Sequence, residues 1–128
     1  MTNGREVRDY LNKAREELAA AESLLSGAHT AAALSRTYYA MYHATQGLLL
    51  SIGKSYSSHK ASINGFSQHF VKTGAFSRDY FKRLTRAFEL RMEGDYDPTS
   101  GIDSATAKEI YGWAEDFLAA AEEYLNKD

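Results

Sequence analysis

Apolar side chains recur every three or four residues along most of the chain, and this helical periodicity constrains the fold more than any other feature. Five stretches carry it, at about residues 5–25, 30–52, 59–71, 78–93 and from 103 or 104 onward. Strand-like alternation is absent, and the only proline, Pro98, lies in the loop-forming segment GDYDPTSG. Because short connections favour antiparallel neighbours, we predict an all-α, up-and-down bundle of four to five helices. Residues 1–128 are expected to form one domain.

Several residues are predicted to mark helix ends. Asn3, Ser58 and Ser77 precede helical stretches and carry side-chain oxygens that can accept a hydrogen bond from a free N–H of the first turn. Asp103 or Ser104 is expected to begin the last helix. Gly27 and Gly53 follow helical stretches, and a glycine there can supply the left-handed residue that ends a helix.

Two features that the sequence lacks indicate the cellular compartment of the protein. There are no cysteines, which excludes a disulfide scaffold and thiolate metal sites and fits a reducing compartment. No apolar run is long enough for a transmembrane helix, and the first residues, MTNGREVRDY, lack the apolar segment of a signal peptide. We therefore expect a cytoplasmic protein with no membrane association.

The net charge of −2 conceals a segregation of charge along the chain. Residues 54–91 contain eight Lys or Arg and two acids, whereas residues 92–128 contain two bases and ten acids. Such asymmetry can indicate a face that meets a polyanion. The alternative is that neighbouring helices pair with one another's charges.

One arginine and one histidine interrupt the apolar helix predicted over residues 30–52. Arg36 is the only Lys, Arg, Asp or Glu between Gly27 and Gly53, and His43 follows it by two helical turns. Both fall on the side of the helix opposite the predicted core stripe, which consists of Leu34, Tyr38, Met41, Thr45, Leu48 and Ile52. An arginine can hold two phosphate oxygens, and a histidine titrates near neutral pH. This pair is the candidate catalytic site.

The rest of that side is made of small or apolar residues, so we expect a further helix or a second subunit to cover it. Tyr39 and Tyr42 flank the pair and are predicted to stack on bases. The alternative is that both tyrosines belong to the edge of the core, that His43 is a hydrogen-bonded interior residue, and that Arg36 bridges to an acid on the last helix. No acid lies at ligand spacing from His43, so no metal site is expected.

The stretch 78–93 carries two kinds of basic residue. Arg78, Lys82 and Arg86 recur at every fourth position and form a basic ridge that could touch a phosphate backbone. Arg91 falls instead on the apolar side, where a charge requires a partner. Asp95 is the nearest partner that the sequence offers, so Arg91 and Asp95 are predicted to form a buried polar cluster at the helix end.

Four segments together resemble the HEPN family, named for higher eukaryotes and prokaryotes nucleotide-binding. They are SRTYYAMYHA, SSHK, FVKTG and ELRMEGDYDP. The resemblance covers nearly the whole chain and is greatest to the small, stand-alone bacterial and archaeal branch. It implies a four- to five-helix bundle that dimerises. It also implies a motif of Arg, four to six residues, then His, which matches Arg36 and His43 here.

The resemblance further implies a function. Many members with this motif are metal-independent ribonucleases, often toxins, whose partner is commonly a small nucleotidyltransferase that is encoded next door and acts as antitoxin. Other members look inert and serve as binding modules. Two positions depart from the better-studied members. Thr45 stands where some toxins carry a tyrosine that the partner modifies, and Thr37 follows the motif arginine, where a functional polar residue is common.

Metal-free RNA cleavage needs a proton acceptor, a proton donor and positive charge near the attacked phosphorus. One Arg and one His supply part of this set, and a homodimer would supply the rest. The leading prediction is therefore a dimeric, metal-independent endoribonuclease of the toxin type that requires no cofactor. The alternatives are a non-catalytic module that binds a nucleotide or a small nucleotidyltransferase, and a purely structural dimer.

Overall fold

The computed structural model describes residues 4–96 and 101–126, apart from the side chains of residues 94–96. The described part is helical and contains no strand. Its elements are α1 (Gly4–Ser26), α2 (Thr30–Ser51), α3 (His59–Phe66), the short π-helical turn η1 (Ser67–Val71), α4 (Arg78–Tyr96) and α5 (Ser104–Leu125). The predicted all-α bundle is confirmed.

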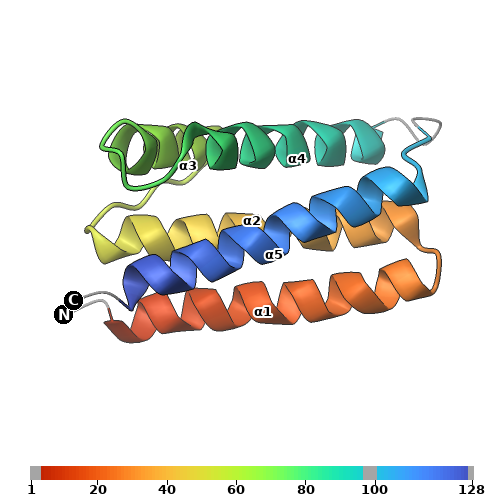
Figure 1. Cartoon of the computed structure of the whole chain (residues 1–128), viewed down its shortest axis with the longest axis horizontal. Coiled ribbons are helices and arrows are strands. Elements are labelled where there is room, and N and C mark those ends of the chain that lie inside the picture. Colours follow the sequence, from red (N-terminus) through yellow and green to blue (C-terminus); the bar gives the residue numbers. More distant parts are fainter. Residues whose placement is uncertain (1–3, 97–100, 127–128) are drawn as a thin grey trace.

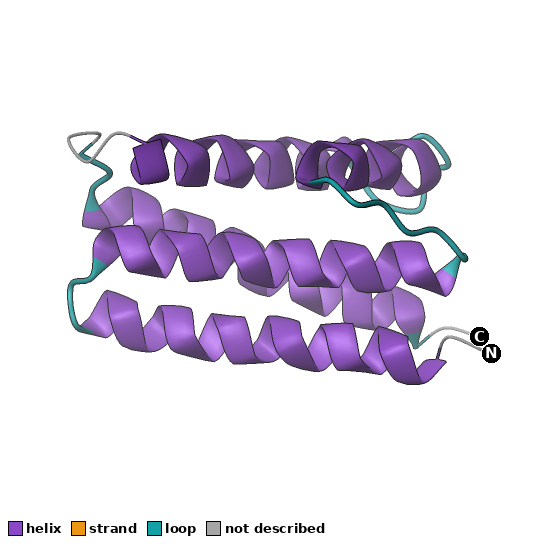
Figure 2. Ribbon diagram, turned by 180° about the vertical axis from the view of Figure 1, so that it is seen from behind, coloured by secondary structure: helices purple, strands orange, loops and turns teal. Residues whose placement is uncertain are grey.

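Helix α2 occupies the centre of the bundle. It contacts α1, α3, α4 and α5, whereas α1 and α4 lie on opposite sides of it (Figure 1). Seen from behind, α2 lies in front of α5, with α1 below it and the layer of α3 and α4 above it (Figure 2). A helix surrounded in this way must be apolar on most of its faces, which explains the lack of charge between residues 37 and 51.

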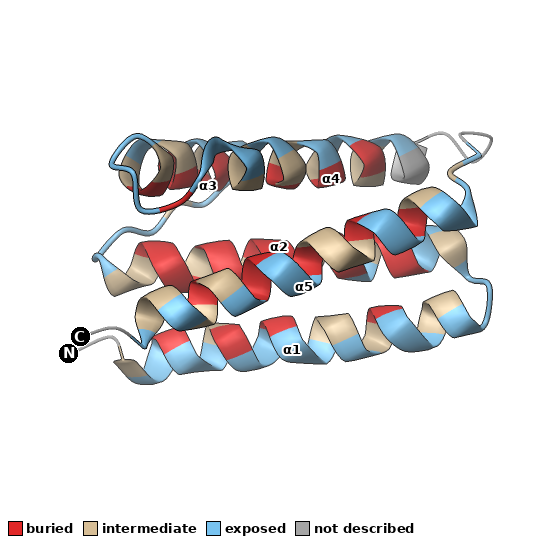
Figure 3. Cartoon of the chain, viewed as in Figure 1, coloured by how far each residue is buried: buried red, intermediate tan, exposed pale blue. Residues whose placement is uncertain are grey.

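The core lies where α2 faces α4 and α5 (Figure 3). Leu34, Tyr38, Met41 and Leu48 of the predicted α2 stripe are all less than 2% exposed. Ile52, the last residue predicted for this stripe, is 40% exposed because the helix has already ended at Ser51. No helix within the described ranges has both the length and the apolar character needed to span a membrane.

The small-residue side of α2 is covered by α1 of the same chain. Ala33, Ala40 and Gly47 are buried there. A Cβ added at Gly47 would lie 3.4 Å from the Cβ of Tyr10 and 3.6 Å from the Val7 carbonyl oxygen. The two backbones therefore approach closely, and of the two covers expected for this face the structure shows the further helix.

The predicted N-cap Ser58 is confirmed, and of the two residues expected to begin the last helix Asp103 is the cap. Asn3 lies outside the described residues. The Ser58 side chain accepts a hydrogen bond from the Ala61 N–H at 3.0 Å, and the Asp103 carboxylate accepts one from the Thr106 N–H at 2.8 Å. Gly53 is left-handed, with φ of 74°, as its place after α2 predicted.

Two predicted helix ends are wrong. The left-handed residue after α1 is Ala28, with φ of 62°, and not Gly27. A Cβ at Gly27 would approach the exposed His29 ring to 3.0 Å. Helix α4 continues to Tyr96, beyond the predicted end at Glu93.

Candidate active site

Arg36 and His43 converge on one carboxylate, that of Glu17 in α1. The Arg36 Nη1 donates a hydrogen bond to Glu17 Oε1 at 3.1 Å, and His43 Nε2 lies 3.9 Å from Glu17 Oε2. The Arg36 side chain is 53% exposed, whereas those of His43 and Glu17 are each 16% exposed. The site therefore lies near the surface where α1 packs against α2, which we call the α1–α2 seam. Its guanidinium is open to solvent, whereas the imidazole and the carboxylate are largely buried.

Helical geometry explains why these groups meet. Arg36 and His43 lie seven residues apart on α2 and share a side of that helix. Tyr10, Lys13 and Glu17 occur at spacings of three and four on α1 and share a side in the same way. Close packing at Gly47 brings the two sides together.

The His43 ring is enclosed by tyrosines. The rings of Tyr39 and Tyr42 both lie 6.1 Å from it between centroids, and that of Tyr10 lies 6.4 Å away in a stacked orientation. His43 Nδ1 is buried and has no hydrogen-bond partner among the described residues. The nitrogen that faces the carboxylate, Nε2, is therefore the one that can exchange a proton with a bound group.

Burial dominates the ionisation of His43. It lowers the pKa of His43 below the usual value, because the charged ring loses contact with water. The Glu17 carboxylate opposes this effect, whereas the charges of Lys13 and His59 reinforce it. The imidazole therefore favours its neutral form near pH 7, which is the form that accepts a proton.

The sequence did not reveal the part that α1 plays. Glu17, Lys13 and Tyr10 lie beside the apolar stripe of α1, where a charged residue is usually exposed to solvent. Tyr10 is an aromatic residue beside that stripe, and it was the one feature of α1 in the sequence that could have indicated a contact with the site. The alternative in which Arg36 bridges to an acid on the last helix is wrong, because its partner is Glu17 on the first helix.

An open groove of about 310 Å³ runs along α1 from this site. It is lined by Glu6, Asp9, Tyr10 and Lys13. Tyr10 forms part of the groove and also stacks against His43, which itself does not line the groove.

A second aromatic group lies on the other side of Tyr39 and Tyr42. The His59 ring stacks on Tyr42, with centroids 4.1 Å apart, and contacts the edge of Tyr39 at 6.0 Å. The Tyr38 hydroxyl lies 2.6 Å from His59 Nδ1. Burial raises the pKa of Tyr38 far above its usual value, so this phenol stays protonated and donates while Nδ1 accepts.

These contacts change the roles predicted for the flanking tyrosines. Tyr42 is 9% exposed and is engaged by His59, which leaves little of its ring for a base. Tyr39 is partly exposed but carries Arg91, whose guanidinium carbon lies 5.0 Å from the ring centroid. Tyr10 borders the open groove and replaces them as the candidate platform.

Arg91 is half-buried, as its place on the apolar side of the helix predicted. Its contact with Tyr39 is a cation–π interaction. The pKa of His59 is lowered by burial and, to a smaller extent, by the charge of Arg91. The side chain of Asp95, the predicted partner, lies outside the described residues.

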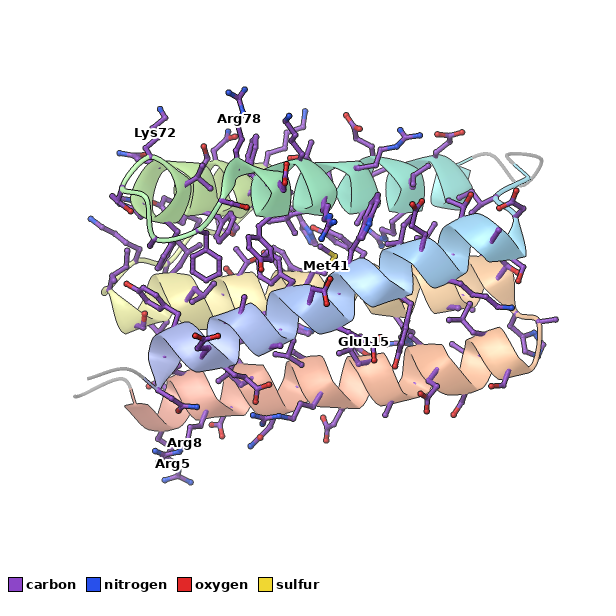
Figure 4. All side chains as sticks on the ribbon, in the orientation of Figure 1. Arg5, Arg8, Met41, Lys72, Arg78 and Glu115 are labelled. Atoms are coloured by element: carbon purple, nitrogen blue, oxygen red, sulfur yellow. The ribbon has the colours of Figure 1, made fainter. Side chains whose placement is uncertain are left out.

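The basic ridge lies on a different part of the surface. Arg78, Lys82 and Arg86 are exposed on α4, and Arg78 points away from the bundle on the side opposite α1 (Figure 4). Arg86 is paired with Glu89 of the same helix at 3.8 Å. The structure thus separates this ridge from the Arg36–His43 site at the α1–α2 seam.

The two threonines that depart from the family motif face the interior. Thr37 donates to the Ala33 carbonyl at 2.8 Å and Thr45 to the Met41 carbonyl at 2.9 Å, and both are fully buried. Neither hydroxyl is available to the site. Within the described ranges, no group of three or more His, Cys, Asp or Glu side chains is arranged to hold a metal ion.

The chain matches known proteins over almost its whole length. The model of the HEPN domain matches residues 7–124. The UPF0332 protein of Thermotoga maritima is 35% identical over 119 residues, which cover 93% of this chain and 90% of that protein. A protein of Methanocaldococcus jannaschii that is named as a candidate toxin is 29% identical over 121 residues, covering 94% of this chain and 82% of its own.

A solved structure has the same fold. The crystal structure of TT1696 from Thermus thermophilus superposes with a TM-score of 0.80 and 21% sequence identity, covering 97% of this chain and 99% of that one. This likeness concerns the arrangement of helices alone. The match of the family model across the bundle, together with the similarity to the relative from Thermotoga maritima, shows that the chain belongs to the HEPN domain family.

Proposed function

We propose that this protein is a metal-independent endoribonuclease of the toxin type, and that Arg36 and His43 act on the RNA phosphate. The observation that supports this most directly is their convergence on Glu17. A guanidinium N–H and an imidazole nitrogen both face one carboxylate. An oxyanion of similar size in that position would be within reach of both groups, as a phosphodiester must be during cleavage.

The reaction is a transesterification. The 2′-oxygen of a ribose attacks the adjacent phosphorus and gives its proton to neutral His43, while Arg36 stabilises the charge that develops on the non-bridging oxygens. The bond from phosphorus to the 5′-oxygen then breaks, and that oxygen takes a proton from a general acid. The products are a 2′,3′-cyclic phosphate and a 5′-hydroxyl, and neither a metal ion nor a cofactor takes part.

The general acid is proposed to come from a second copy of the chain. One His43 cannot accept and donate a proton in the same step, and His59 of the same chain already uses its Nδ1 with Tyr38. In a homodimer that pairs two sites, the second His43 would be the general acid when it carries a proton, the form that its Glu17 favours. The names of relatives such as the one from Methanocaldococcus jannaschii support a toxin role. A small nucleotidyltransferase is the antitoxin that this role calls for.

The test is cleavage of RNA in the presence of a chelator. Wild-type protein is expected to cleave, and His43→Gln is expected to be slower by about 100- to 10,000-fold, the usual loss when a general base is removed. His29→Gln is the matched control, because His29 is an exposed histidine at the start of α2. Intact RNA with wild-type protein, or equal rates for wild type and His43→Gln, would reject the proposal.

A second candidate is a non-catalytic binding module. The low exposure of His43 and the inward-facing Thr37 and Thr45 favour it, because they leave few polar groups open to a substrate. Such a module would bind a nucleotide or a small nucleotidyltransferase with equal affinity in wild-type and His43→Gln forms, and would leave RNA intact.

A further inference from the structure

Glu17 occupies the position that the proposed reaction assigns to the phosphate. It accepts a hydrogen bond from the Arg36 Nη1 at 3.1 Å, with its second oxygen 3.5 Å from the same nitrogen. That second oxygen also lies 3.9 Å from His43 Nε2. A carboxylate bears negative charge and only accepts hydrogen bonds, as a phosphodiester does. The two anions cannot share this position.

We propose that Glu17 is an internal competitor for the anion site: its carboxylate holds Arg36 and His43 in the free protein and must be displaced by the phosphodiester of a single-stranded nucleic acid. This inference rests on the proposed function for the identity of the ligand. It assigns to Glu17 the role of setting how tightly that ligand binds.

The surroundings allow the exchange. Glu17 belongs to α1, whereas the groups that it holds belong to α2, so its side chain can turn aside without moving Arg36 or His43. Arg36 is half-exposed, so a ligand can reach its guanidinium from solvent. Lys13, one turn before Glu17, is close enough to influence the charge of His43 and can pair with a bound phosphate.

Competition of this kind also provides selectivity. A ligand with one weak acceptor would bind poorly. It would break the ion pair between Glu17 and Arg36 and form only one hydrogen bond in its place. A phosphodiester has two non-bridging oxygens, so it can engage the guanidinium and still face the imidazole. The site therefore favours anions with two acceptor oxygens over ligands with a single acceptor.

The test compares Glu17→Gln with Glu16→Gln. Both remove one negative charge from α1, but Glu16 is exposed on the helix surface and has no part in the site. The probe is a short single-stranded oligodeoxynucleotide, which carries phosphodiesters but lacks the 2′-hydroxyl and cannot be cleaved by transesterification. Affinity is measured by fluorescence anisotropy at fixed salt, because phosphate binding depends strongly on ionic strength.

We expect Glu17→Gln to bind the probe roughly fivefold more tightly than wild type, the gain when a partly exposed ion pair no longer competes. The gain should exceed that of Glu16→Gln and should disappear when Arg36→Ala is added. Equal affinities for the two glutamine variants, weaker binding by Glu17→Gln, or a gain that survives Arg36→Ala would overturn the proposal. If circular dichroism shows that Glu17→Gln is unfolded, Glu17→Ala is read by the same criteria.

The outcome is separate from that of the cleavage assay. Tighter probe binding by Glu17→Gln with no cleavage of RNA by wild type would retain the internal competitor and reject the nuclease. Cleavage by wild type without any gain in probe binding would retain the nuclease and reject the internal competitor.

Discussion

His43 experiences two opposing influences, which together decide the form in which it meets a substrate. Burial favours the neutral ring, and the Glu17 carboxylate favours the charged one. His59 is also partly buried, and both its burial and the charge of Arg91 lower its pKa. Since burial is the larger influence on both rings, each is expected to be neutral near pH 7.

These shifts predict that stability falls on mild acidification. Because both rings resist protonation in the folded state, the unfolded chain binds protons first as the pH falls below about 6.5. The free energy of unfolding should therefore decrease between pH 7.5 and pH 5.5, as measured by urea denaturation. The double variant His43→Gln, His59→Gln should lose most of this slope, whereas His29→Gln should keep it. An unchanged slope in the double variant would contradict the assignment of this pH dependence to His43 and His59.

The sequence revealed the α2 half of the site and not the α1 half. Arg36 and His43 stand out because they interrupt a helix that is otherwise uncharged, and their spacing places them on one side. Glu17 carries no such signal, since a glutamate on an amphipathic helix is ordinary. Periodicity shows which side of α1 faces the core, but it does not fix the rotation of α1 against α2. The packing of α1 along α2, which is close at Gly47, decides which α1 residues meet His43.

At the level of the helices, ends with a clear chemical signal were predicted and others were not. Ser58 and Asp103 cap helices because their oxygens match a free N–H. The turn after α1 was assigned to Gly27, yet the left-handed residue is Ala28. The sequence favours glycine for such a position, but the chain turns one residue later, at Ala28.

Two helix glycines predict opposite effects of the same substitution. In α3, a Cβ at Gly65 would lie 2.6 Å from Tyr56 Cε2, and the Tyr56 ring is held by His69 through a hydrogen bond of 3.2 Å. Gly65→Ala should therefore lower the free energy of unfolding by about 1–3 kcal/mol. In α5, a Cβ at Gly112 would meet nothing within 4 Å. Gly112→Ala should raise stability by up to about 1 kcal/mol, because alanine favours the helix.

Thermal and urea unfolding of the two alanine variants would measure both effects on one scale. A Gly65→Ala protein as stable as Gly112→Ala would show that Tyr56 is not held against α3 as the structure has it.

At the level of the whole molecule, the segregated charge of the sequence is partly resolved within the bundle. The acidic α5 pairs with basic residues of two neighbours, Arg83 with Asp116 at 3.7 Å and Arg15 with Glu122. These pairs support the interpretation that neighbouring helices satisfy one another's charges. The fold class followed from periodicity alone, whereas the central position of α2 depends on contacts with four other helices that periodicity does not specify.

The proposed second copy predicts a particle of twice the chain's 14.3 kDa. Light scattering coupled to size exclusion at micromolar concentration would measure it. A monomer at that concentration would contradict the composite site, because the general acid would then have no source.

The chemistry of the RNA ends tests the central claim most directly. RNA treated with wild-type protein in chelator would be analysed by mass spectrometry. The account predicts fragments with a 2′,3′-cyclic phosphate and a 5′-hydroxyl, formed by wild type and Glu16→Gln and nearly absent with Arg36→Ala or His43→Gln. Fragments ending in a 3′-hydroxyl and a 5′-phosphate, or cyclic ends formed equally well by the His43→Gln protein, would contradict it.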